Sequence, residues 1–188
     1  MAKKILIVSG HTDLNDSVAN KCILEELHSR LPEAEMDYLS ELYPDYRIDV
    51  AAEQKKLVAA DIVVLQFPVF WYSQPSLLHR WMEEVFKHGF SHGSQGKALA
   101  GKRLIASFTS GAPADMYSHE GAMGHTIEEM IMPPIEGTAR LTGMVLAPFV
   151  YTGGVSYATR NDKEALAAMV QRSQEHAARL ISEIKGLM

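Results

Sequence analysis

The chain has 188 residues, of which 47% are hydrophobic and 22% are charged, a balance typical of a soluble globular protein with one substantial core. Lysine and arginine number 18 and aspartate and glutamate 23, and the net charge of −5 excludes an electrostatic case for binding DNA or RNA. The single cysteine, Cys22, excludes an intramolecular disulfide and a multi-cysteine zinc site. We therefore expect a single domain that spans residues 1–188.

The start of the chain superficially resembles a secretion signal, because Lys3 and Lys4 precede an apolar run. The run ends at Ser9, and it is shorter than the roughly 7–15 apolar residues that a signal needs. No segment approaches the roughly 20 apolar residues that span a bilayer. The sequence therefore predicts a cytoplasmic protein without membrane insertion.

The first half of the chain alternates apolar runs with amphipathic segments. We expect strands at residues 3–9, 35–39 and 61–67, and helices from Asp16 or Ser17 through 31, at 51–59 and at 76–87. The apolar runs of the first and third strands are unbroken, as expected of parallel strands that are covered on both faces. Residues 40–50 contain Pro44 and should form an irregular excursion between the second strand and the next helix.

The second half continues the alternation. We expect a strand near 102–108, helical segments at 125–131 and onward to about Thr142, a strand at 144–150 and a helix at 162–185. Pro133 and Pro134 should break or restart the middle helix, because proline lacks an amide donor. Pro148 indicates that the last strand lies at an edge of the sheet or ends there.

This alternation predicts an α/β fold, a doubly wound five-stranded parallel sheet in the flavodoxin-like order 2-1-3-4-5. Right-handed crossovers then bring the loops after strands 1, 3 and 4 to one edge of the sheet. These loops are residues 9–17, 67–75 and 109–121, and they are also the richest in polar, glycine and aromatic residues. The sequence therefore predicts a ligand site where they meet.

Each loop has a functional and a structural interpretation. The loop at 9–17 precedes a helix N-terminus, where an anion is favoured with help from Ser17 and His11, but Ser17 could equally only cap the helix. The aromatic residues of 67–75 suit a planar ligand, or they fill a core beneath a turn. In the third loop, small residues allow close approach of a ligand, and Tyr117 is either a hydrogen-bond donor or an ordinary surface tyrosine.

Other motifs are missing or weak. The chain contains neither GxGxxG nor a P-loop, and it has no nucleophile elbow of the G-x-S-x-G type. His88 and His92 are four residues apart, but the glycines around them argue against a helical metal pair and no carboxylate cluster accompanies them. We therefore predict no metal site.

Residues 66–93, QFPVFWYSQPSLLHRWMEEVFKHGFSHG, carry a specific resemblance to a known family. With GHTDLNDSVAN, IDVAAEQKKLVAADIVV, Gly101–Lys102 and TSGAPADMYSHEG, nearly the whole chain resembles the flavodoxin-like NAD(P)H:quinone oxidoreductases. That family includes quinone reductase, the modulator-of-drug-activity proteins and the ancillary oxidoreductases of potassium-efflux systems.

The resemblance implies a tightly held flavin. Relatives of this size use either FMN or FAD, and we expect FMN because the chain lacks an obvious extra pocket for adenine. The segment matching the flavin phosphate site is His11, Ser17, Val18, Ala19 and Asn20, and the loop matching the isoalloxazine wall, where amides approach N5, is Pro68, Val69, Phe70, Trp71 and Tyr72. Thr109, Ser110, Gly111 and Ala112 match a Thr-Thr-Gly-Gly run at the pyrimidine edge, with Ser110 and Ala112 as departures.

The resemblance also makes Tyr117 the catalytic candidate, matching a tyrosine near flavin O2. Some relatives have a histidine six positions later, where this chain has Met123, with His119 and His125 nearby. The implied activity is two-electron reduction of quinones or similar acceptors by NADH or NADPH in a ping-pong mechanism. A homodimer is implied as well. The alternatives are a regulatory subunit peripheral to a potassium-efflux transporter and a flavodoxin-like electron carrier.

Overall fold

The computed structural model describes residues 3–188 and confirms the predicted alternation of strands and helices. The strands are β1 (Ile5–Ser9), β2 (Glu35–Tyr38), β3 (Ile62–Pro68), β4 (Arg103–Thr109), β5 (Val145–Leu146) and β6 (Val150–Thr152). The helices are α1 (Ala19–Arg30), α2 (Leu39–Leu42), α3 (Val50–Ala59), α4 (Ser76–Val85), α5 (Ile127–Thr142) and α6 (Lys163–Gly186). Single 3₁₀ turns occur at Leu14–Asp16, Ala114–Met116 and Tyr157–Thr159. Within residues 3–188, no helix combines the length and the apolar character needed to cross a membrane.

The sheet is parallel throughout, and its order β2-β1-β3-β4-β5 is the one predicted. Its last position is shared, because β5 pairs with the start of β4 and β6 pairs with Ser107–Thr109 at the end of β4. The prediction of one strand over 144–150 is therefore wrong, because two short strands, β5 and β6, take its place. Pro148 has no amide to donate to β4, so pairing stops there and resumes in β6, which continues to Thr152.

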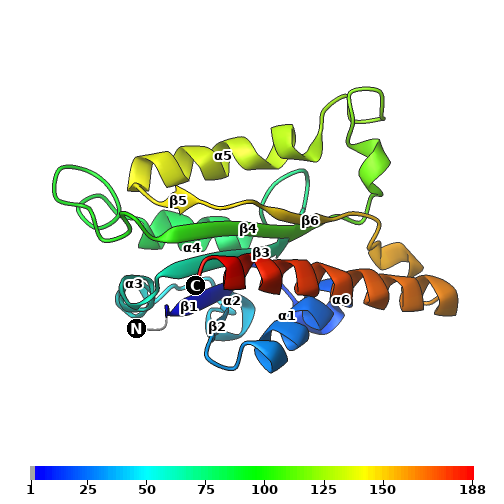
Figure 1. The fold of residues 1–188 in the computed structure, drawn as a ribbon, viewed down its shortest axis with the longest axis horizontal. Helices are drawn as coiled ribbons and strands as arrows, with labels where there is room; N and C mark the ends of the chain where they lie inside the picture. The colour runs from blue at the N-terminus through cyan, green and yellow to red at the C-terminus, as the bar shows by residue number, and fades with distance from the viewer. Residues whose placement is uncertain (1–2) are drawn as a thin grey trace.

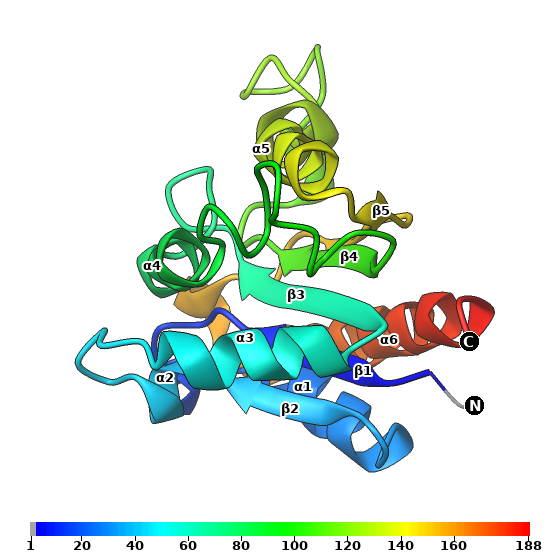
Figure 2. The same cartoon turned by 90° about the vertical axis from the view of Figure 1, so that its left-hand side faces the viewer.

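Two helical layers cover the sheet. Helices α1 and α6 pack on one face, and α3, α4 and α5 cover the other (Figures 1 and 2). Alternate residues of each strand enter the two cores, so that Ile5 and Ile7 contact the α1–α6 layer while Leu6 and Val8 contact the opposite layer. This double burial explains the unbroken apolar runs in the sequence.

Helix α5 corrects a second prediction. It runs without interruption from Ile127 to Thr142 through Pro133 and Pro134. Both prolines lie on the exposed face of the helix, so water can bind the carbonyl groups that lose an amide partner. Ile131 and Ile135, which flank the prolines, are buried on the other face and hold the helix to the sheet.

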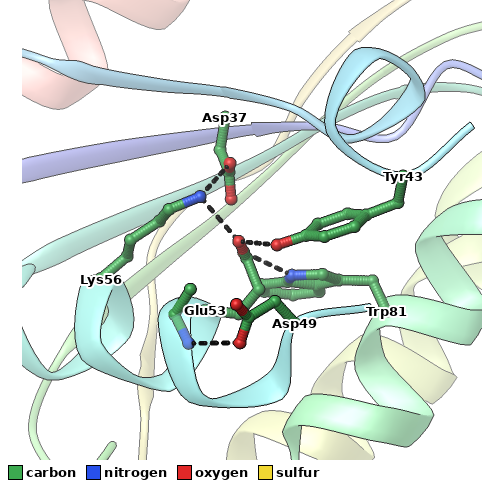
Figure 3. Close-up of polar contacts among 7 residues, drawn as sticks. Asp37, Tyr43, Asp49, Glu53, Lys56 and Trp81 are labelled. Carbon is green, nitrogen blue, oxygen red and sulfur yellow. Dashed lines mark hydrogen bonds and ion pairs between the residues drawn. The ribbon is translucent and has the colours of Figure 1, made fainter. Parts of the chain in front are cut away.

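The excursion at residues 40–50, which includes α2, is fixed by a buried polar cluster beside β2 (Figure 3). Glu53 of α3 accepts hydrogen bonds from the hydroxyl of Tyr43 and the indole nitrogen of Trp81, both at 2.7 Å. Lys56 Nζ lies 2.6 Å from a carboxylate oxygen of Glu53 and 2.6 Å from Asp37 Oδ1. One lysine charge is therefore shared by two buried carboxyl groups.

The two carboxyl groups titrate differently. Burial raises the pKa of Glu53, but its contacts with Asp37, Lys56, Tyr43 and Trp81 together hold that pKa below the ordinary value. Burial is the largest cause of the opposite shift at Asp37, with Glu53 beside it, and the pKa of Asp37 is raised to about 7. The second oxygen of Asp37, Oδ2, has no hydrogen-bond partner within residues 3–188.

We predict that Asp37→Asn changes the pH dependence of stability. Because the folded protein binds more protons at Asp37 than the unfolded chain does between about pH 4 and 7, this group lowers the free energy of unfolding as pH rises through that range. The substituted asparagine does not titrate, so the free energy of unfolding of the variant does not fall in this way. The difference between the variant's free energy of unfolding and that of wild type should therefore rise by roughly 1–4 kcal/mol in favour of the variant from pH 5 to pH 8. Urea unfolding at both pH values measures the difference. The exposed variant Asp45→Asn is the matched control, and equal pH profiles for Asp37→Asn and wild type would contradict the prediction.

Candidate functional site

A cavity of about 670 Å³ lies at the carboxyl ends of β1, β3 and β4, within the size range of small-molecule sites. Four segments line it: the β1–α1 loop with the start of α1, the β3–α4 loop, the end of β4, and the loop from β6 to α6. Gly10 lets the first loop pass close to α4, because a Cβ there would lie 2.8 Å from the side chain of Leu78.

The cavity brings together most of the predicted site residues. Those that line it are His11, Ser17, Val18, Ala19, Asn20, Pro68, Val69, Phe70, Thr109 and Gly111. The residues of the same loops that do not line it are Trp71, Tyr72, Ser110, Ala112 and Tyr117. The lining residues are consecutive or nearly so along the chain, as expected when strand ends deliver them to one edge.

One end of the cavity is built to accept an anion. Ser17 Oγ accepts a hydrogen bond from the amide of Asn20 at 3.2 Å, so this serine both caps α1 and lines the cavity. The first amides of a helix have no acceptor within it, and Val18 and Ala19, at the start of α1, both line the cavity. Arg160 lines the same cavity, 3.9 Å from Asp16. The N-terminus of α1 and Arg160 therefore border the same cavity, together with Asp16.

His11 contributes a neutral donor. It is only 8% exposed, and burial lowers its pKa against the opposing effect of Asp13 and Asp16. Its Nδ1 accepts the amide hydrogen of Asp13 at 3.0 Å, so the neutral ring carries its proton on Nε2. The ring also contacts Phe70 edge-on, with 5.7 Å between the centroids. Of the two roles expected for His11, donor and positive charge, the geometry favours the donor.

The aromatic loop forms a tight hairpin turn. Phe70 and Ser73 exchange backbone hydrogen bonds of 3.0 and 3.1 Å, and Trp71 and Tyr72 between them have φ values of +48° and +61°. These angles correspond to a type I′ turn, which normally requires glycine or asparagine. Trp71 is 94% exposed and Tyr72 is half exposed. The turn therefore holds two aromatic side chains outside the cavity in a strained backbone conformation.

The amides of this loop are already partly used. Pro68 has none, the amide of Val69 donates to the carbonyl of Thr109 at 2.7 Å, and that of Phe70 donates to Ser73. Among the predicted wall residues within residues 3–188, only Trp71 and Tyr72 keep amides that donate to no other backbone group, and neither of these two residues lines the cavity. The approach of loop amides to the flavin N5 stays a prediction.

In the third loop, Ser110 and Tyr117 are not among the residues that line the cavity. The Ser110 hydroxyl bonds the carbonyl of Ala112 and the hydroxyl of Tyr151, both at 2.7 Å. Tyr117 is buried and contacts the ring of Tyr151 edge-on. His119 and His125 are exposed and lie 3.5 and 3.8 Å from Glu129 at the start of α5. The role of Tyr117 stays a prediction.

The loop after β6 was missed by the sequence analysis. Its cavity residues are Val155, Ser156, Tyr157, Ala158 and Arg160, joined by Met169 of α6. The guanidinium of Arg160 stacks over the Tyr157 ring at 3.2 Å. The signal in the sequence was the pair Gly153–Gly154 directly after an apolar strand. It was overlooked because the last strand was ended at residue 150 instead of Thr152.

Comparisons with known proteins agree with this geometry. A family model described as having a flavodoxin-like fold matches residues 3–177. The glutathione-regulated potassium-efflux system ancillary protein KefF of Enterobacter sp. (strain 638) is 40% identical over 147 residues, covering 77% of this chain and 80% of that protein.

Solved structures agree as well. General stress protein 14 of Treponema denticola, in complex with FMN, superposes with a TM-score of 0.83 and 29% identity over 96% of this chain and 99% of that chain. An NADPH-quinone reductase of P. pentosaceus gives a TM-score of 0.75 and 26% identity over 94% of this chain and 98% of that chain. The match to the family model over nearly the whole length, together with a relative at 40% identity, shows that the chain belongs to the flavodoxin-like family whose motifs its sequence resembles.

Proposed function

We propose that the protein is an FMN-dependent NAD(P)H:quinone oxidoreductase. The observation that carries this proposal is the cavity, which joins an anion-binding helix N-terminus to an apolar wall at the switch point of a doubly wound sheet. The FMN complex of one structural neighbour and the quinone reductase identity of another support the same assignment.

The cavity residues fit FMN. Ser17, the amides of Val18 and Ala19, and Arg160 would bind the phosphate, because all are donors and the helix dipole adds positive potential. The FMN complex of general stress protein 14 from Treponema denticola supports FMN in preference to FAD. Val69, Phe70 and Met169 supply the apolar wall for a flat ring.

When bound, FMN supplies hydride transfer between a nicotinamide donor and a quinone-like acceptor that use the site in turn. The chain's own residues position the two reactants. The amides of Trp71 and Tyr72 are the donors of the aromatic loop left for the ring edge, and small residues of the third loop allow close approach at the other edge. We retain Tyr117 as the residue expected to stabilise negative charge there, acting from its buried position beside Tyr151.

The exposed turn at Trp71 and Tyr72 is assigned to acceptor binding and to the homodimer expected for this family. Left-handed backbone at two aromatic residues costs stability, and strain of this kind is retained where function uses it. An aromatic side chain that is 94% exposed on one subunit becomes buried when an acceptor or a second subunit covers it.

A transporter-linked role is the second candidate. The specific observation that favours it is the 40% identity to KefF, an ancillary protein of a potassium-efflux system. In that case the protein would dock on a membrane transporter as a peripheral subunit.

The purified protein tests the main proposal. We expect it to bind FMN, with a yellow visible spectrum, and to oxidise NADH or NADPH steadily when a soluble benzoquinone is supplied. A protein that remains colourless after reconstitution with FMN and with FAD would overturn the proposal. A flavin-loaded protein that turns over quinone only when a transporter is present would favour the second candidate.

Arg160→Gln tests the phosphate site. The variant should bind FMN about tenfold more weakly, because one charge-assisted hydrogen bond to phosphate is lost. Its affinity for riboflavin, which has no phosphate, should equal that of wild type. Fluorescence titration of both flavins measures the contrast. Arg140→Gln, which removes an exposed arginine of α5, is the control, and an equal loss of riboflavin and FMN binding would contradict the assignment.

Two substitutions of Trp71 separate strain from function. Trp71→Gly should be about 1 kcal/mol more stable than Trp71→Ala in urea unfolding, because only glycine adopts the φ of +48° without steric cost. Both variants lack the indole ring, and both should show a raised KM for the quinone. Equal stability of the two variants would show that the turn is unstrained, and an unchanged KM would remove Trp71 from the acceptor site.

A further inference from the structure

A buried chain of side-chain hydrogen bonds runs from the surface of α6 to the cavity. Its members in order are Arg179, Thr152, His176, Ser107, Gln66, Asn20 and Thr109. The successive distances are 2.7, 2.9, 2.7, 2.6, 2.9 and 3.1 Å. Gln66, Ser107 and His176 are 0% exposed. The chain lies between the sheet and the α1–α6 layer, and only Asn20 and Thr109 reach the cavity wall.

The hydrogens of this chain run in one direction. The side-chain oxygen of Gln66 only accepts, so Ser107 donates its single hydroxyl hydrogen to it. Ser107 can then only accept from His176, which places the proton of that ring on Nε2. Burial lowers the pKa of His176 to about 3, so the ring is neutral and its Nδ1 accepts from Thr152. Thr152 in turn accepts from Arg179, which has donors only.

The same direction continues toward the cavity. The side-chain nitrogen of Gln66 donates to Asn20, whose own side-chain nitrogen donates to the Thr109 hydroxyl. Within residues 3–188, the hydroxyl hydrogen of Thr109 has no protein acceptor. Each bond in such a chain polarises the next, and the guanidinium at the outer end strengthens the donor at the inner end.

We propose that this chain makes Thr109 an obligate hydrogen-bond donor to the cofactor, and that His176 is the positioning residue that sets its direction. The atom opposite Thr109 is therefore an acceptor, a carbonyl oxygen or an unprotonated ring nitrogen, and not the N–H group of the flavin ring. The proposal rests on the flavin site described above.

If the hydrogen-bond chain only linked the helical layer to the sheet, removing one of its members would still destabilise the fold. The test must therefore separate an effect on FMN binding that acts through Thr109 from a loss of stability. FMN dissociation constants are measured for wild type, Ser107→Ala, Thr109→Val and the double variant. Each single variant should bind about fivefold more weakly, and the double variant no more weakly than Thr109→Val, because Ser107 acts only through the Thr109 hydroxyl. Additive losses would overturn the proposal.

Ser173→Ala is the matched control. Ser173 is another fully buried serine, on α6, and its hydroxyl bonds the carbonyl of Met169 outside the chain. The Ser173→Ala variant loses the same side-chain hydroxyl as Ser107→Ala, and it should leave the FMN affinity unchanged. A loss of FMN affinity in Ser173→Ala equal to that in Ser107→Ala would attribute the effect to packing and would overturn the proposal.

A second measurement reads the protonation of His176 in the wild-type protein, so its result does not depend on the stability of a variant. Nitrogen-15 NMR of histidine-labelled wild type, with His176→Gln used for assignment, should show His176 neutral and protonated on Nε2 at pH 5 to 8. A proton on Nδ1 would mean that the chain runs the other way and that Thr109 accepts, which overturns the inference. Wild type that does not bind FMN would overturn the proposed function and the role of Thr109 toward FMN, whereas wild type that binds FMN with a Nδ1–H ring would overturn this inference alone.

Discussion

The parallel pairing of β1, β3 and β4 is the constraint on which the rest of the structure depends. Each strand delivers its following loop to the same edge, but α1 packs on one face of the sheet and α4 on the other. The loops after β1 and β3 must therefore diverge, and a crevice opens between them. The cavity occupies that crevice, with the start of α1 on one side and the β3–α4 loop on the other.

The core under α1 and α6 changes character toward this edge. Along β3, Ile62 and Val64 face the helices and are followed on the same face by Gln66. Burying a polar side chain such as Gln66 lowers stability unless hydrogen bonds within the protein replace those that the side chain makes to water in the unfolded state. The hydrogen-bond chain from Arg179 to Thr109 supplies such bonds to Gln66, Ser107 and His176. By contrast, Asp37 on the opposite face of the sheet has one side-chain oxygen with no hydrogen-bond partner among residues 3–188, and its burial raises its pKa.

The sequence predicts what local periodicity controls. The unbroken strands and amphipathic helices determine the sheet order, and that order places three loops at one edge. The prediction that Pro133 and Pro134 break the helix fails at α5 because both prolines face solvent. Which residues face solvent depends on the rotation of the helix about its axis. The extent of β6 and of the loop after it depends on the pairing of β6 with β4. The buried hydrogen-bond chain likewise joins residues as far as 89 positions apart in the sequence. Such contacts leave no mark in a single sequence.

The site divides its work between rigid and strained backbone. Thr109 and Asn20 are held by strands, a helix and hydrogen-bonded neighbours on every side, so a cofactor bound there meets donors already in place. Trp71 and Tyr72 project from a two-residue turn with unfavourable φ and few contacts. In the proposed mechanism two reactants occupy one space in turn, so the wall of that space exposes apolar surface whenever the space is empty. Because the backbone strain lies in the turn at Trp71 and Tyr72, the residues that we propose bind the cofactor, Thr109 and Asn20, carry none of that strain.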